Sequence, residues 1–196
     1  HLLRKMIFDL KKRGLYEMGE GLYQKAADTF LEAMELQKEL NEQEQDPELQ
    51  ELYQRCLDLD MAQKLKLQGD EHGAKWLAQW NTDSENHIER DAYEEDFNAA
   101  IAKYNESFSY DPEEDRAGAI PARDALIKAR WGTTDRKAIL RGLQQKCEDE
   151  LAAGRLASCR NTAALALGLA TESDPVWTSE SFRQSFLGHA SLIDAD

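Results

Sequence analysis

The sequence is short of the residues that build β-structure and loops. Its 196 residues include a single valine, four prolines and eleven glycines, whereas Ala, Leu, Glu, Gln and Lys are abundant. The extended alternation of Val, Ile and Thr that predicts strands does not occur. Because the abundant residues are good helix formers, we expect an all-α protein.

Cysteine is also scarce. Cys56, Cys147 and Cys159 form no Cys-x-x-Cys motif, and each lies in a helical pattern where a small apolar residue fits. We therefore expect buried free thiols, which favour a cytoplasmic location. No apolar run reaches transmembrane length and no signal-like segment occurs, so we expect no membrane insertion. Since the first residue is His1, we expect a trimmed or processed form, or a fragment.

Motifs for catalysis and for metal binding are missing as well. The sequence has no His-Glu-x-x-His helix, no glycine-rich phosphate loop, no nucleophile elbow and no Asp-rich calcium loop. We therefore expect no catalytic residues, no metal and no cofactor, and we predict a protein that is not an enzyme. An enzyme would need His72 or His87 to meet several carboxylates in one pocket.

Acidic charge is in excess and lies mainly in the middle third of the chain. The formal net charge is −14, and residues 42–115 carry twenty-one acidic against six basic side chains. Such a field repels nucleic acid and attracts basic partners. The alternative is a solvated helix surface with no binding role.

Local signals divide the chain into about eight helices. Asp46-Pro47 and Asp111-Pro112 each place a capping Asp before a first-turn proline. Gly69 and Gly73 predict a break near the end of the third helix, and Pro121 predicts a kink or a late start in the fifth. The expected helices run approximately over 2–18, 22–42, 47–79, 83–110, 112–131, 134–152, 155–171 and 176–192.

Residues 14–36 combine small and large side chains as a tight helix–turn–helix hairpin does. The small residues would let two helix backbones approach closely, and the large ones would fill the space beside them. The set is Gly14, Gly21, Ala26 and Ala33 with Tyr23, Phe30 and Leu36. This layout resembles one tetratricopeptide repeat over about residues 7–40. The resemblance implies stacked antiparallel hairpins that bind other proteins.

Two weaker matches to the same repeat follow, at about 82–112 and 140–171. The first lacks the glycine expected near Ile88 in its first helix, which would run from Thr82 to Glu95. In the second, Cys147 stands where the first glycine would be. Because the spacings are not multiples of the usual repeat length, we expect inserted helices, notably 47–79, to separate the hairpins.

These matches predict one all-α domain over 1–196, a tetratricopeptide-repeat-like α-solenoid of stacked antiparallel hairpins. Residues 1–112 would form the repeat-bearing half. Residues 113–196 would form C-terminal helices that continue the stack or cap its end. A competing resemblance covers residues 1–68, which are similar to a three-helix microtubule-interacting-and-trafficking module, a family that binds short helical peptides.

In the repeat family the first helix of each hairpin lines a peptide groove. This resemblance places Phe8, Lys11, Leu15 and Met18 on the groove of the first hairpin. A carboxylate clamp of the family uses Lys and Asn there, and Leu15 in place of Asn argues against it. In the second hairpin the groove would carry Glu85, Glu89 and Tyr93. Glu85 and Glu89 lie four residues apart, and a basic ligand would relieve their repulsion.

The sequence thus predicts a non-catalytic interaction module or adaptor. It would bind a protein or peptide partner, basic or amphipathic in character, and neither nucleic acid nor membrane. An acidic chaperone for one client, a microtubule-interacting-and-trafficking-like peptide binder and a self-assembling scaffold, hence a homo-oligomer, stay open as alternatives.

Overall fold

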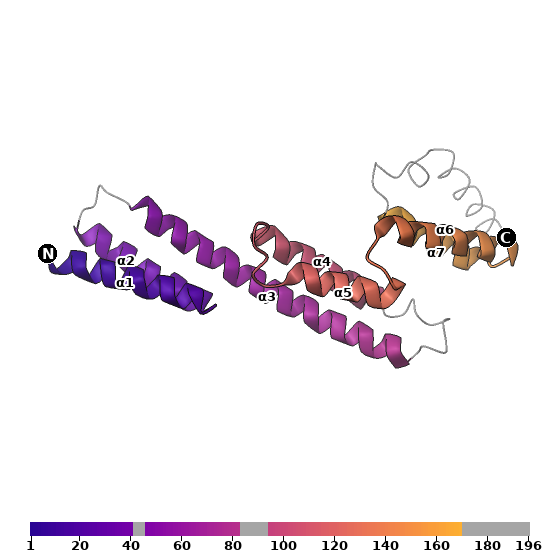
Figure 1. Ribbon diagram of the computed structural model, residues 1–196, viewed down its shortest axis with the longest axis horizontal. Helices are drawn as coiled ribbons and strands as arrows, with labels where there is room; N and C mark the ends of the chain where they lie inside the picture. The colour runs from indigo at the N-terminus through magenta and orange to yellow at the C-terminus, as the bar shows by residue number, and fades with distance from the viewer. Residues whose placement is uncertain (41–45, 83–93, 170–196) are drawn as a thin grey trace. The chain divides into compact units, whose positions relative to one another are not determined.

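Helices make up all the regular secondary structure in the described part of the chain. The computed structural model describes residues 1–40, 46–82 and 94–169. The helices are α1 Leu2–Gly19, α2 Tyr23–Leu40, α3 Pro47–Thr82, α4 Glu94–Tyr110, α5 Ala119–Trp131, α6 Arg136–Ala152 and α7 Leu156–Leu169 (Figure 1). The prediction of an all-α protein is confirmed.

The chain divides into two compact units, His1–Leu126 and Ile127–Asp196, with the division inside α5. The described ranges contain seven helices where about eight are expected for the whole chain, and the expected helix at 176–192 lies outside those ranges. A single solenoid over 1–196, continued or capped by its C-terminal helices, stays a prediction.

The first hairpin, α1 with α2, turns through a glycine in the left-handed conformation. Gly21 has φ +76°, and its N–H donates to the Met18 carbonyl at 3.1 Å. The Leu22 N–H donates to the Glu17 carbonyl at 2.9 Å. These two bonds form the Schellman arrangement, which satisfies the last carbonyls of α1 and reverses the chain within three residues.

The two helices of this hairpin pack closely at Gly14. A Cβ built there would lie 2.5 Å from Cε1 of Phe30, and Phe30 is fully buried. The glycine therefore makes room for the aromatic ring of α2. Around this contact lies one core cluster drawn from α1, α2 and the start of α3: Ile7, Ala26, Ala27, Phe30, Ala33, Leu49 and Cys56.

The predicted break at 69–73 is wrong, because α3 is one helix of 36 residues. A Cβ at Gly69 would lie 2.7 Å from the ring of Tyr104 in α4, and Gly73 faces the Tyr104 hydroxyl and Leu126. These glycines therefore let α4 and α5 approach the helix and do not end it.

α3 packs against α2 with its first half and against α4 with its second half (Figure 1). Two hydrogen bonds join α4 to α3, one near the middle of α3 and one in its second half. The Ser107 hydroxyl donates to the Ala62 carbonyl at 2.6 Å, and the Tyr104 hydroxyl donates to Asp70 at 2.9 Å. α3 thus packs on both α2 and α4. The prediction that 47–79 is inserted between hairpins stays a prediction, because most of the expected first helix of the second hairpin lies outside the described residues.

The predicted helix start at Asp111-Pro112 is also wrong, because residues 111–118 form turns and α5 begins at Ala119. The Asp111 carboxylate is buried and accepts from Arg55 of α3 at 2.6 Å, so it does not cap a helix. Asp115 takes that role, since its carboxylate accepts from the Ala119 and Ile120 N–H groups at 2.9 and 3.0 Å. Pro121 then falls in the first turn, where it needs no donor.

The hairpin of the second unit, α6 with α7, has the same turn as the first. Gly154 has φ +73°, and its N–H donates to the Leu151 carbonyl at 3.1 Å. The Arg155 N–H donates to the Glu150 carbonyl at 2.8 Å. Each of these residues lies 133 positions after its counterpart in the α1–α2 turn. α6 and α7, which include most of the weak match at 140–171, therefore reverse through the same turn as α1 and α2.

Both hairpins also bury a glutamate against a threonine twelve residues later. In the first, Glu17 is 2% exposed and accepts from the Thr29 hydroxyl at 2.9 Å and from Arg13 at 2.6 Å. In the second, Glu150 accepts from the Thr162 hydroxyl at 2.8 Å. A buried carboxylate needs such donors, so each bond fixes how its two helices are aligned.

We expect Thr29→Val to lower the free energy of unfolding by about 1–3 kcal/mol, because it removes one donor from a buried carboxylate. Urea unfolding of the full chain measures the loss. Thr134→Val is the matched control, since Thr134 is exposed and lies outside the helices. Equal midpoints for the two variants would show that the Glu17–Thr29 bond does not stabilise the hairpin.

Candidate functional site

The most unusual exposed surface in the first unit belongs to α1. Half of the large apolar side chains exposed in the described residues lie between positions 2 and 22. Phe8 is 61% exposed and Leu15 is 46% exposed. Seven residues separate them, so they lie on one face of the helix, two turns apart. Leu2, Met6, Tyr16 and Leu22 are also exposed, although Met6 lies on the opposite side of α1 from Phe8.

Helical periodicity explains how α1 exposes these residues. The helix buries Ile7, Gly14 and Glu17 against α2 and α3. The core therefore occupies one side of the helix, and Phe8 and Leu15 fall on another side, where both are exposed. Isolated exposed apolar residues are normal in proteins, but several gathered on one helix are typical of a binding surface.

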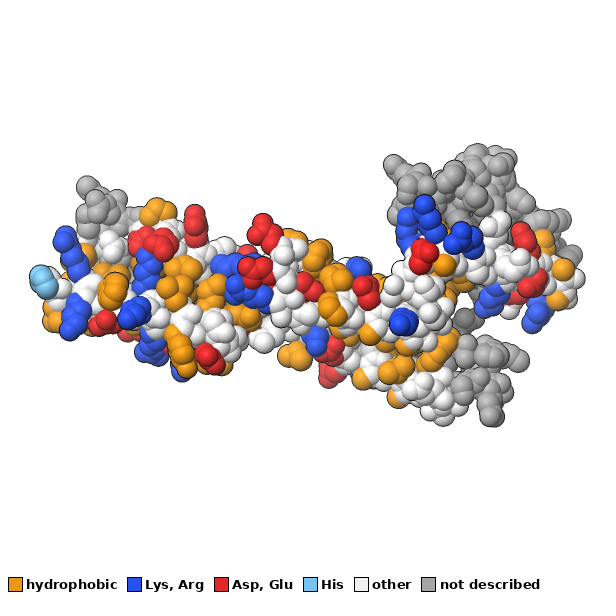
Figure 2. All heavy atoms as spheres, viewed as in Figure 1, with side chains coloured by type: hydrophobic (Ala, Val, Ile, Leu, Met, Phe, Trp, Pro, Cys, Tyr) orange, Lys and Arg blue, Asp and Glu red, His pale blue; other side chains and the backbone are white. Residues whose placement is uncertain are grey.

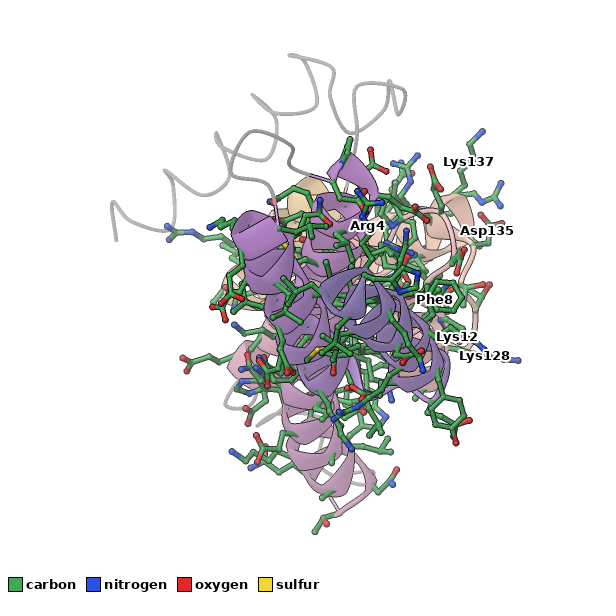
Figure 3. All side chains as sticks on the ribbon, turned by 90° about the vertical axis from the view of Figure 1, so that its left-hand side faces the viewer. Arg4, Phe8, Lys12, Lys128, Asp135 and Lys137 are labelled. Carbon is green, nitrogen blue, oxygen red and sulfur yellow. The ribbon has the colours of Figure 1, made fainter. Side chains whose placement is uncertain are left out.

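Basic side chains surround the apolar ones. The α1 segment carries five basic and two acidic residues, and one of the acidic ones is the buried Glu17. Arg4, Phe8 and Lys12 follow one another at four-residue steps along the helix (Figure 3). The Lys12 ammonium lies 5.9 Å from the centre of the Phe8 ring. Figure 2 shows basic and apolar side chains interspersed over this N-terminal hairpin. We call Arg4, Lys5, Phe8, Lys12 and Leu15 the α1 face.

The four groove residues predicted for the first hairpin fall into different environments. Phe8 and Leu15 are exposed on the α1 face. Met18 is half-buried and packs against the core cluster. Lys11 is paired with Glu48 at the start of α3 and lies 4.0 Å from Asp46. The Lys11 charge is therefore partly neutralised within the chain.

The residues predicted for the second hairpin, Glu85, Glu89 and Tyr93, lie outside the described residues. The described helices on either side of these residues in the chain are α3 and α4. There Asp70 pairs with Lys66 at 2.7 Å and accepts from Tyr104, and burial together with this bond raises the pKa of the Tyr104 hydroxyl. Asp70 therefore already has two partners within α3 and α4, Lys66 and Tyr104.

His72 is one of the two histidines that an enzyme could use in a pocket with several carboxylates. His72 lies within α3, and its Nδ1 is 3.0 Å from Asp96 of α4. This contact joins α3 to α4. Across the described ranges, no three His, Cys, Asp or Glu side chains are arranged to hold a metal ion.

Comparisons with known proteins identify no relative. No protein-family model, no curated protein and no solved structure matches the chain. None of the helices within 1–40, 46–82 and 94–169 combines the length and apolar character needed to cross a membrane.

Sequence reasoning missed two features that define the hairpins, the buried Glu17 and the buried Glu150. A signal for them exists in the sequence. Each glutamate lies four residues before the turn glycine and twelve before a threonine, as Glu17, Gly21 and Thr29 show. The same Glu–Gly–Thr spacing occurs in both hairpins, and it therefore indicates the shared turn as the small residues do.

Proposed function

We propose that this chain is a non-catalytic protein-interaction module that binds an acidic amphipathic segment of a partner on the α1 face. The observation that supports this is the exposed apolar pair Phe8 and Leu15 set among basic side chains. A helix lying on such a face would bury its apolar side against the pair. Helix-in-groove recognition of this kind relies on anchors at spacings of three, four and seven residues.

Charge complementarity indicates the sign of the partner. Arg4, Lys5 and Lys12 are exposed, whereas Asp9 is the only acidic residue of α1 that is not buried. Carboxylates at the edges of the partner helix would pair with these cations and speed association. Like charges there would oppose binding, so a basic segment is disfavoured at this face.

The fold supports the stacked-hairpin account more than a three-helix module. α3 packs on α2 and continues without interruption to pack on α4, and α1–α2 and α6–α7 share one turn and one buried Glu–Thr pair. The basic-ligand hypothesis depends on Glu85, Glu89 and Tyr93, which the structure does not describe. That hypothesis, the client chaperone and the self-assembling scaffold stay predictions.

Two synthetic helical peptides test the proposed function. Both carry leucines at positions i, i+3 and i+7, and one has Glu and the other Lys on the polar side. We expect the acidic peptide to bind about tenfold more tightly, because three exposed cations contribute a few tenths to one kcal/mol each. Fluorescence anisotropy with the full chain measures both affinities, and high salt should reduce the difference.

Matched variants locate the binding surface. We expect Phe8→Ser/Leu15→Ser to abolish binding, since it removes the apolar anchors. Leu67→Ser/Leu77→Ser, two exposed positions on α3, is the control and should bind as the unmodified chain does. Equal binding by both double variants would contradict the α1 face as the site, and tighter binding of the Lys peptide would contradict the proposed partner.

A further inference from the structure

Two cysteine side chains of the second unit lie in direct contact. The Sγ atoms of Cys147 in α6 and Cys159 in α7 are 3.1 Å apart. The residues are 0% and 3% exposed, and all three cysteines of the chain are free thiols. The third, Cys56, belongs to the core cluster of the first unit. The pair in the second unit is therefore placed to react internally.

The hairpin geometry explains why these thiols meet. Cys147 and Cys159 lie 133 residues after Gly14 and Ala26, where α1 and α2 approach closely. The shared turn at Gly154 and the Glu150–Thr162 bond hold α6 and α7 in the same alignment as the first hairpin. Where the first hairpin has a glycine against the ring of Phe30, the second has a thiol against a thiol.

We propose that Cys147 and Cys159 form an intramolecular disulfide when the chain meets a disulfide oxidant such as oxidised glutathione. One thiolate attacks the glutathione disulfide, which forms a mixed disulfide and releases one glutathione thiolate. The second thiolate then attacks the protein sulfur of the mixed disulfide and releases the second glutathione. The protein loses two protons and two electrons, and oxidised glutathione is reduced to two thiols.

Only a small movement separates the free pair from the bonded one. A disulfide bond is about 2.0 Å long, so the sulfur atoms need to approach by roughly 1 Å. The disulfide would close a short loop that includes the Gly154 turn and would link α6 covalently to α7. This link restricts the conformations of the unfolded chain and so stabilises the folded hairpin.

Burial controls the rate of the reaction. Burial raises the pKa of the Cys147 thiol, and its contact with Cys159 adds to the shift. The thiol also donates to the Cys159 carbonyl at 3.1 Å. Since the thiolate is the nucleophile, Cys147 or Cys159 can attack oxidised glutathione only when α6 and α7 separate locally. The disulfide would then be protected from reduction by the same burial.

The test uses the full chain with Cys56→Ser, so that a single pair of thiols remains. After incubation with oxidised glutathione in native buffer, we expect intact mass spectrometry to show the loss of two hydrogen atoms. Peptide mapping should give one cross-link between Cys147 and Cys159. The urea midpoint of the second unit should rise and should return to its starting value with dithiothreitol.

Two results would overturn the proposal. One is retention of both free thiols in the native chain under conditions that oxidise the urea-unfolded chain completely. The other is a chain that carries two glutathione adducts and no internal cross-link. Cys147→Ser in the same background is the control, and it should retain a glutathione adduct on Cys159 or a free thiol. Thiol counting on the unmodified chain gives the same answer without any variant.

Discussion

Gly14→Ala is expected to lower the free energy of unfolding of the first unit by about 2 kcal/mol, the middle of the range for overpacked cores. The new Cβ would lie 2.5, 2.7 and 2.9 Å from three carbons of the Phe30 ring. Phe30 is fully buried, so the ring has no open space into which to move. Alanine gains about 1 kcal/mol over glycine in a helix, and the clash must exceed that gain.

Gly19→Ala is the control for this prediction, because it makes the same change in the same helix. A Cβ at Gly19 would meet nothing within 4 Å. We expect that variant to be as stable as the unmodified chain, or up to about 1 kcal/mol more stable. Urea unfolding followed by circular dichroism measures both. If Gly14→Ala were as stable as Gly19→Ala, the close approach of α1 and α2 at Gly14 would be wrong.

Asp111→Asn is expected to lower the free energy of unfolding by about 2–3 kcal/mol near neutral pH, somewhat less than a fully buried pair because Arg55 is partly exposed. The Asp111 carboxylate is 1% exposed and accepts from Arg55 at 2.6 Å and from the Arg116 N–H at 2.7 Å. The neutral amide keeps the size of the side chain but loses the charge that pairs with Arg55.

The pH dependence of this effect follows from the pKa of Asp111. Burial alone would raise that pKa, but the hydrogen bonds from Arg116 and Arg55 and the charges of both arginines hold it below the usual range. A lowered pKa in the folded state gives stability that is complete above the unfolded value of about 3.9 and is lost as pH falls further. The stability difference between the unmodified chain and Asp111→Asn should therefore be constant from pH 7 to about 5 and shrink below 4.

Glu113→Gln is the control for the Asp111 prediction, because Glu113 is an exposed acid of the same loop. We expect its stability to match that of the unmodified chain at every pH. Guanidinium unfolding is unsuitable because it screens charge, so urea unfolding from pH 3 to 7 measures the difference. A difference that stayed constant through pH 3, or that was absent at pH 7, would contradict the role of the Arg55–Asp111 pair.

Much of the fold could be predicted from the sequence where a local signal has one meaning. Asp46-Pro47 begins α3 as expected, with the Asp46 carboxylate accepting from the Glu48 N–H at 3.0 Å. Gly154 ends α6 as expected. Gly69 and Gly73 mislead because glycine has two roles, in chain reversal and in close packing. Only the position of Tyr104, thirty-five residues later, selects the second role.

Asp111 misleads for a similar reason. An aspartate before proline is a common helix start, yet the same side chain can pair with a distant arginine. Arg55 lies fifty-six residues earlier in the chain, so no local pattern reveals the pair. Tertiary contacts of this kind decide the local structure at residues 111–118.

The candidate site is partly predictable on the same grounds. The repeat resemblance selected Phe8 and Leu15, and the structure places both on the exposed face of α1. It also selected Lys11, whose partner Glu48 comes from the start of the next helix. The basic character of the face was missed, because the acidic excess in the middle of the chain dominates the overall charge. The contact between Cys147 and Cys159 could have been found by transferring the Gly14 and Ala26 positions to the third match.

The measurement that tests the central claim most directly is a two-dimensional NMR titration of the isotope-labelled full chain with the acidic amphipathic peptide. The account predicts that the largest amide shifts lie in α1, around Phe8, Lys12 and Leu15, and that the Lys peptide needs about tenfold higher concentration to produce them. Shifts concentrated elsewhere in the chain, or no saturable shift with the acidic peptide, would contradict the claim that the α1 face is the docking surface.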